Sequence, residues 1–117
     1  MGYPMQHAQV AESLIYSKYS EDPDLAGIVE AFVSELPERL AQMERSFQCL
    51  DWEGLRRTAH QLRGAAGSYG FQPITDLSAR LENSVREMRC ETGVRQALDD
   101  LTDLCQRARP RPAIART

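Results

Sequence analysis

A histidine in the middle of the chain, His60, is the residue whose type and surroundings are best suited to chemistry. A neutral imidazole carries a lone pair that can act as a nucleophile. At about 100° per residue of an α-helix, the apolar positions around His60 gather between about 180° and about 260° from it. These positions are Leu55, Ala59, Leu62, Ala66 and Tyr69. We therefore predict that His60 stands in solvent, opposite the buried face of its helix.

The face around His60 is rich in positive charge. Arg56, Arg57 and Arg63 lie within about 60° of His60 on this helix, and Glu53 is the one acid among them. Guanidinium groups at these positions can stabilise a phosphorylated imidazole, which is an anion, through fork-like hydrogen bonds. The same arginines would also attract an acidic site on a partner protein.

Two glycines continue this face toward the end of the helix. Gly64 follows His60 by one helical turn, and Gly67 extends the same strip. A glycine inside a helix costs roughly 1 kcal/mol relative to alanine, which indicates that the imidazole needs an open flank that another protein can approach. An exposed histidine beside arginines is also compatible with an ordinary solvated helix face, and spacing alone does not decide between the two.

Helical periodicity accounts for almost the whole chain. The predicted helices span residues 6–19, 25–50, 52–69, 73–88 and 94–105. Short connections between four amphipathic helices indicate an all-α fold, an antiparallel four-helix bundle with the N-terminal helix as a short cap. We therefore divide the chain into a capping helix (1–20), the bundle (21–108) and a flexible basic tail (109–117).

Local signals predict where these helices begin and bend. Asp22 followed by Pro23 is the expected start of the helix over residues 25–50, because aspartate caps and proline suits the first helical position. Asp51 and Thr92 are the expected caps of two later helices. Pro37 is expected to kink or locally break its helix, because proline lacks the N–H that the helix needs.

The composition is that of a soluble domain. The chain has 117 residues, of which 42% are hydrophobic and 26% charged, with a formal net charge of −3. This charge argues against nucleic acid as a partner, and no apolar run is long enough to cross a membrane. Because no secretory signal is visible, we expect a cytoplasmic protein. Its three cysteines are expected to be buried or half-buried free thiols, and a metal site is not expected. They are Cys49, Cys90 and Cys105.

Residues 59–71, AHQLRGAAGSYGF, resemble the phosphoacceptor helix of histidine-containing phosphotransfer (HPt) domains. The family pattern is a histidine, any residue, an aliphatic residue, lysine or arginine, then glycine, with another glycine several residues later. Its places are taken here by His60, Leu62, Arg63, Gly64 and Gly70. The family's downstream Leu-Glu pair and its upstream phenylalanine with an acidic neighbour also have counterparts. These are Leu81-Glu82, Phe32 and Glu35.

The resemblance implies a phosphohistidine carrier rather than an enzyme. It implies that His60 carries the phosphoryl group, that Arg63 assists it and that Gly64 keeps the site open. The implied partners are a response-regulator receiver domain and, upstream, a hybrid sensor histidine kinase. The resemblance also implies no cofactor of the chain's own, with magnesium supplied by the receiver. Exposed residues of the preceding helix, Glu35 and Arg39, are expected at the docking face.

Two other functions fit the sequence. The bundle could be a helical adaptor that only binds partners, with His60 incidental. It could also be the phosphoacceptor module of a larger chemotaxis-type histidine kinase, in which a linked ATPase domain phosphorylates His60.

Overall fold

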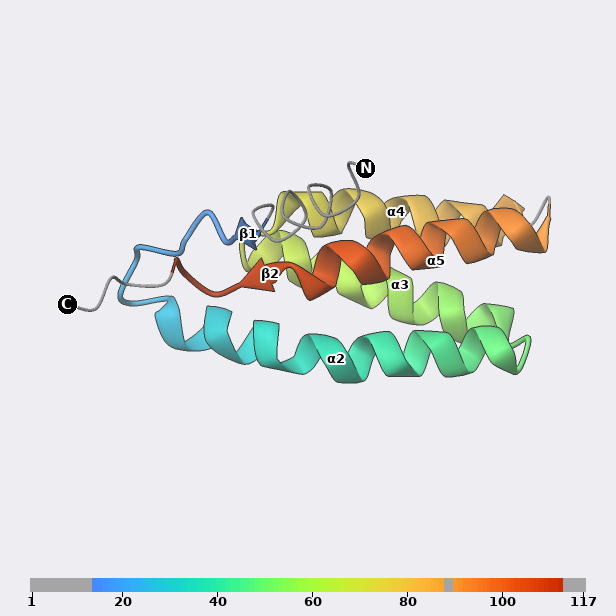
Figure 1. The fold of residues 1–117 in the computed structure, drawn as a ribbon, viewed down its shortest axis with the longest axis horizontal. Helices are drawn as coiled ribbons and strands as arrows, with labels where there is room; N and C mark the ends of the chain where they lie inside the picture. Colours follow the sequence, from blue (N-terminus) through green and yellow to red (C-terminus); the bar gives the residue numbers. More distant parts are fainter. Residues whose placement is uncertain (1–13, 88–89, 113–117) are drawn as a thin grey trace, which may run out of the picture.

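The computed structural model describes residues 14–87 and 90–112. Its helices alternate in direction along the chain, so that each lies antiparallel to the next (Figure 1). The all-α four-helix bundle predicted from the periodicity is therefore confirmed. The helices are α2 (Ala26–Gln48), α3 (Trp52–Ser68), α4 (Gln72–Glu87) and α5 (Glu91–Gln106).

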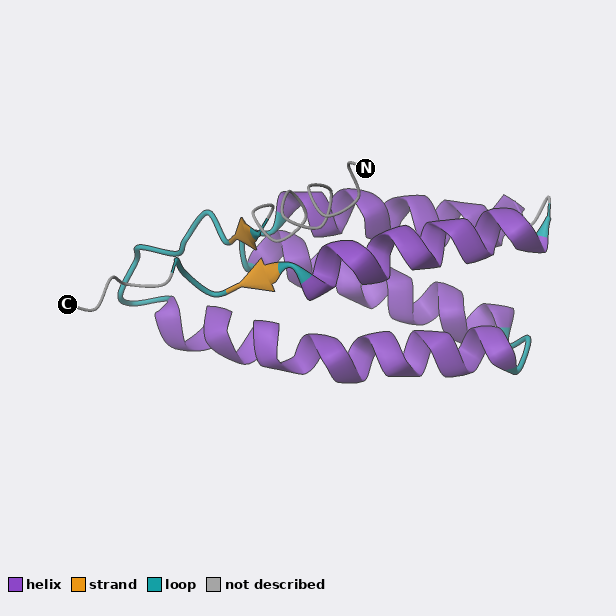
Figure 2. Ribbon diagram, viewed as in Figure 1, coloured by secondary structure: helices purple, strands orange, loops and turns teal. Residues whose placement is uncertain are grey.

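Two short parallel strands pair the segment before α2 with the segment after α5, next to the bundle (Figure 2). They are β1 (Ile15–Tyr16) and β2 (Ala108–Arg109), with Ile15 opposite Ala108. The prediction of a helix over residues 6–19 is thus wrong for residues 14–19, and its remainder lies outside the described residues. Arg109, which we expected to begin the tail, belongs to β2, and the tail's residues 113–117 also lie outside the described residues.

Backbone hydrogen bonds to distant residues explain why this segment is extended. The Ile15 N–H donates to the Arg107 carbonyl at 2.9 Å, and the Lys18 N–H donates to the Gly70 carbonyl at 2.9 Å. The Ser17 hydroxyl adds a 2.6 Å bond to the Tyr69 carbonyl. A helix over these residues would bond its own backbone instead, so these long-range partners override the local helical pattern.

Of the three predicted helix caps, one is confirmed and two are wrong. Asp51 caps α3 as expected, since its side chain accepts from the Gly54 N–H at 2.9 Å. Thr92 does not cap α5; the Cys90 thiol accepts from the Gly93 N–H in that role. The cap assigned to Asp22 is also wrong.

The start of α2 shows what Asp22 does instead. Its carboxylate accepts from the Asp24 N–H at 2.9 Å within a turn, and the helix begins only at Ala26. Farther along, α2 passes through Pro37 without ending, so of the predicted kink or break the break does not occur and the kink stays a prediction. Buried side chains on both sides of the proline hold the helix to the core, which offsets the missing hydrogen bond.

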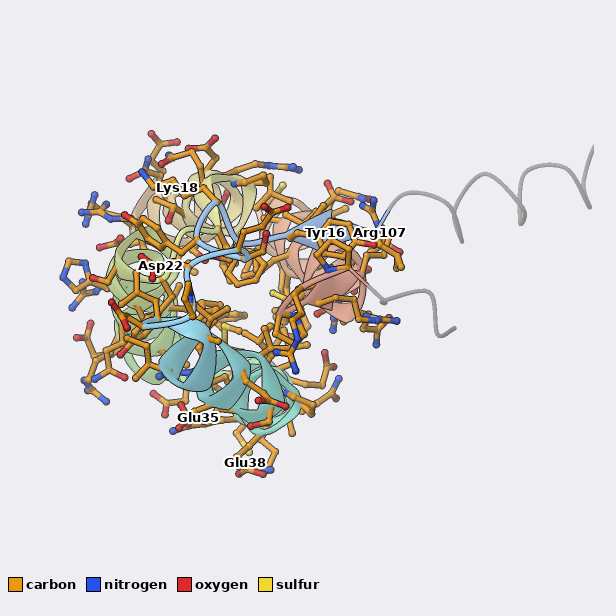
Figure 3. All side chains as sticks on the ribbon, turned by 90° about the vertical axis from the view of Figure 1, so that its left-hand side faces the viewer. Tyr16, Lys18, Asp22, Glu35, Glu38 and Arg107 are labelled. Atoms are coloured by element: carbon orange, nitrogen blue, oxygen red, sulfur yellow. The ribbon has the colours of Figure 1, made fainter. Side chains whose placement is uncertain are left out.

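The core is a single cluster of apolar side chains between the four helices. Viewed along the bundle, charged groups surround it, and Glu38 on α2 points away from it (Figure 3). All three cysteines are free thiols, as predicted, but the predicted burial holds only for Cys105, whose thiol pKa is raised to about 12 by desolvation. Cys49 and Cys90 are exposed. Among the described residues, no helix has the length and apolar character needed to cross a membrane.

Candidate functional site

His60 lies on the outer face of α3, as the helical spacing predicted. Its side chain is 57% exposed, whereas Leu55, Ala59 and Leu62 on the other side of the helix are fully buried. The imidazole is therefore open to a visiting protein. The same helix that exposes it is held in place by the core, so the ring stands on a rigid support.

A buried carboxylate from the next helix holds the imidazole. Glu82 of α4 is only 2% exposed at its side chain, and its Oε2 lies 3.0 Å from the His60 Nδ1. An ionised carboxylate can only accept hydrogen bonds, so in the neutral imidazole this contact places the single ring proton on Nδ1. The other nitrogen, Nε2, then keeps its lone pair.

Three arginines gather around the same carboxylate. Arg63 Nη1 lies 3.1 Å from Glu82 Oε1, and Arg86 Nη2 lies 3.0 Å from Oε2. Arg56 is more distant, with Nη1 3.7 Å from Oε2. We call these five residues, His60 included, the Glu82 cluster. The positive charge that the sequence predicted on α3 is thus joined by an arginine of α4.

Glu53 is not the only acid at the site, and this expectation is corrected. Its carboxylate binds Arg56 at 2.7 Å, and that hydrogen bond lowers the pKa of Glu53 and raises the pKa of Arg56. The central acid is Glu82, 22 residues after His60 in the sequence. Arg57 makes no hydrogen bond or ion pair with any described residue.

Helical spacing on α3 could not predict that Glu82 and Arg86 lie beside His60, because the packing of α4 on α3 places both of them there. Two signals pointed to Glu82, and the first was the resemblance, which matched Leu81-Glu82 to a family pair. The second was the pattern of burial. Along α4, position 82 falls on the buried stripe with Ile74, Leu81 and Val85. A glutamate on such a stripe has to find partners, since burying an unpaired charge is costly.

The flank beside His60 is open. A Cβ built on Gly64 would meet nothing within 4 Å, so the fold itself leaves room for a side chain there. A groove of about 270 Å³ runs past this glycine between α2 and α3. It also includes Glu35 and Arg39, which form a 3.6 Å ion pair on its α2 side. The remaining residues that line it are Ile28, Ala31, Phe32, Ala65, Ser68 and Tyr69.

Gly70 is needed for a different reason. Its φ of +86° lies in the left-handed region, and a Cβ there would come within 2.5 Å of the Ser17 hydroxyl. The second glycine of the motif therefore serves the turn after α3 and the contact with the N-terminal segment, whereas Gly64 serves no contact within the fold.

Comparison with known protein families matches residues 27–110 to the Hpt domain. Searches of curated proteins and of solved structures gave no match. The matched segment takes in all but the first residue of α2, the whole of α3 to α5 and β2, so it contains the complete Glu82 cluster. Since it spans most of the chain, the chain belongs to the Hpt domain family, whose members carry phosphoryl groups on histidine within phosphorelays.

Proposed function

We propose that His60 is the phosphorylated residue of this domain, and that it passes the phosphoryl group to and from receiver domains in a multistep relay. An upstream hybrid sensor histidine kinase would supply the phosphoryl group through its own receiver. The observation that carries the proposal is the His60–Glu82 hydrogen bond on an exposed ring, which in the neutral imidazole leaves the lone pair on Nε2. Within the described residues, His60 is the only histidine.

The chemistry is a direct exchange between two phosphoryl acceptors. The Nε2 lone pair attacks the phosphorus of an aspartyl phosphate on the receiver, and an N–P bond forms as the acyl P–O bond breaks. The electrons of that bond leave with the aspartate carboxylate. The proton on Nδ1 stays where it is, so positive charge develops on the ring and faces the Glu82 carboxylate. Donation to a second receiver reverses these changes.

Charge neutralisation is shared between the two proteins. Arg63 stands one turn from His60 and is held toward the site by Glu82, so its remaining donors can bind phosphoryl oxygens. In this proposal the chain supplies no cofactor; Mg²⁺ held by the receiver neutralises phosphoryl charge during transfer.

The groove beside Gly64 is the proposed docking surface. Ile28 is 49% exposed on α2, which gives a partner an apolar contact next to the small residues of α3. Glu35 and Arg39, which we expected at the docking face, line the same groove and would offer a partner polar contacts. With a bare flank at Gly64, the receiver's active site can approach the imidazole closely.

Transfer from a labelled receiver tests the assignment. The protein is mixed with a phosphorylated receiver domain and Mg²⁺, and the label that appears on it should be acid-labile and base-stable. His60→Gln should abolish this label, and His7→Gln, which changes the other histidine of the chain, should leave it intact. Label that persists in His60→Gln refutes the site, and binding without transfer to or from any receiver would instead support an adaptor.

A further inference from the structure

The positive charge around His60 exceeds what its acids can balance. Among the residues that the structure describes, four guanidinium groups at this site face two carboxylates. The guanidinium groups are those of Arg56, Arg57, Arg63 and Arg86, and the carboxylates are those of Glu53 and Glu82. Two positive charges are left in excess at this site, although the whole chain has a net charge of −3.

The contacts show which arginines supply this excess. Glu53 binds Arg56 through two hydrogen bonds, of 3.2 and 2.7 Å, and so balances it. Glu82 carries one negative charge and pairs with both Arg63 and Arg86, which leaves one positive charge in excess. Arg57 pairs with no acid among the described residues and supplies the second. A phosphoryl group carries about two negative charges near neutral pH, so it would balance the two positive charges in excess at this site.

Arg86 lies beside the imidazole of His60. Its Nη2 and the His60 Nδ1 both lie 3.0 Å from the same oxygen, Glu82 Oε2, so the two nitrogens can be no farther apart than the sum of these distances. The Arg86 side chain is 56% exposed, and its contacts within the described residues are from Nη1 to Asn83 and from Nη2 to Glu82. Its other N–H groups can therefore donate to a new anion without releasing Glu82.

We propose that Arg86 binds the phosphoryl group on His60, so that a residue of α4 as well as one of α3 stabilises the phosphorylated state. This inference rests on the proposed function of His60. Glu82 serves as the fixed anchor that keeps Arg86 beside the imidazole before the phosphoryl group arrives.

The phosphotransfer equilibrium tests this role. The protein is first phosphorylated with phosphoramidate, whose P–N bond breaks to release ammonia, and is then mixed with a receiver domain and Mg²⁺. The ratio of phosphorylated to free forms of both proteins gives the equilibrium constant. That constant depends on the separate proteins and not on how well they dock. Arg86→Gln should shift it about tenfold away from phosphohistidine, equivalent to about 1.4 kcal/mol.

A matched control and a second background make the result specific. Arg80 also lies on α4 but pairs with Asp100 of α5, so Arg80→Gln should leave the equilibrium unchanged. In a Glu82→Gln background, Arg86→Gln should still shift the equilibrium by about the same factor, because its contact is with the phosphoryl group. If the shift vanishes in that background, Arg86 acts only by holding Glu82 and the inference is wrong.

The outcomes also separate this inference from the proposed function. Wild-type protein that takes no label on His60 refutes both. Label on His60 together with the same equilibrium in Arg86→Gln and wild type refutes the role of Arg86 alone.

Discussion

Replacing Glu82 with glutamine tests how the imidazole is prepared for attack. The substitution keeps the size of a side chain that is 2% exposed and removes only its charge. Glutamine has one carbonyl oxygen and one amide group, so its orientation decides the result. At the Oε2 position the structure offers His60 Nδ1 and Arg86 as donors, whereas at Oε1 it offers only Arg63. The carbonyl oxygen should therefore take the Oε2 position.

In that orientation Nδ1 keeps its proton and Nε2 keeps its lone pair. The substitution therefore only weakens the hydrogen bond that Nδ1 donates. A hydrogen bond to a charged group contributes roughly 1.5–3 kcal/mol, and a neutral one about 1 kcal/mol. The difference applies as the ring of His60 becomes positively charged during attack. A change of about 1.4 kcal/mol in the barrier is tenfold in rate. We expect Glu82→Gln to accept phosphoryl groups about tenfold more slowly than wild type.

The assay is the initial rate of His60 phosphorylation by phosphoramidate, which needs no docked receiver. Asp76→Asn is the matched control, because it removes a carboxylate from the exposed side of α4 that binds only Gln72. Circular dichroism confirms that both variants remain helical. A Glu82→Gln rate equal to that of Asp76→Asn would show that the carboxylate does not assist the imidazole, and the mechanism proposed above would be wrong.

Other substitutions test the docking flank and the fold. Gly64→Leu should keep the helical spectrum and the thermal midpoint near those of wild type. It should slow transfer from a receiver at least tenfold but change the rate of phosphorylation by phosphoramidate little. Collapse of the helical spectrum would instead show that this glycine is needed for the fold. Gly70→Ala should lower the free energy of unfolding in urea by about 1–2 kcal/mol or more, because φ is +86°; an unchanged value would contradict this. Leu50, with φ 58° and a mostly exposed side chain, should give the opposite result, with Leu50→Gly raising stability by about 0.5–1 kcal/mol; a loss of stability would mean that its side chain matters more than its backbone. Hydrogen bonding to Arg95 lowers the pKa of Glu44 from 4.5 to about 2, so its carboxylate stabilises the folded state above pH 4.5 and loses this effect as the pH falls through 2. The stability difference between wild type and Glu44→Gln, no more than about 1 kcal/mol for a pair near the surface, should shrink over that range. A difference that is undiminished at pH 2 would exclude this pair as its source.

The sequence was sufficient to predict features that depend on a single helix, such as exposure, burial and capping. The exposure of His60 and the burial of Leu62 follow from the angle between them on α3, which no other element can change. The cap at Asp51 is equally local, since its partner is three residues away. These features were correct because their physical causes lie within one or two turns of helix.

The errors arose where distant segments decide the structure. Residues 14–19 have apolar spacing compatible with a helix, but hydrogen bonds from Ile15 to Arg107 and from Lys18 to Gly70 keep them extended. Glu82 has its role only because α4 packs closely enough on α3 to bring its carboxylate to His60. Helical periodicity predicts which side of its helix a residue occupies, but it does not predict which other helix or strand packs against that side.

The position of Glu82 and Arg86 on successive turns of α4 suggests why the site needs a second helix. A carrier must both accept and release its phosphoryl group, so the phosphohistidine can be neither too stable nor too slow to form. Glu82 acts on the imidazole through Nδ1, and Arg86 is proposed to act on the phosphoryl group at the other end of the ring. Because α3 supplies the proposed nucleophile and α4 supplies both of these groups, substitutions on α4 should tune the rate and the equilibrium of transfer separately while His60 itself is unchanged.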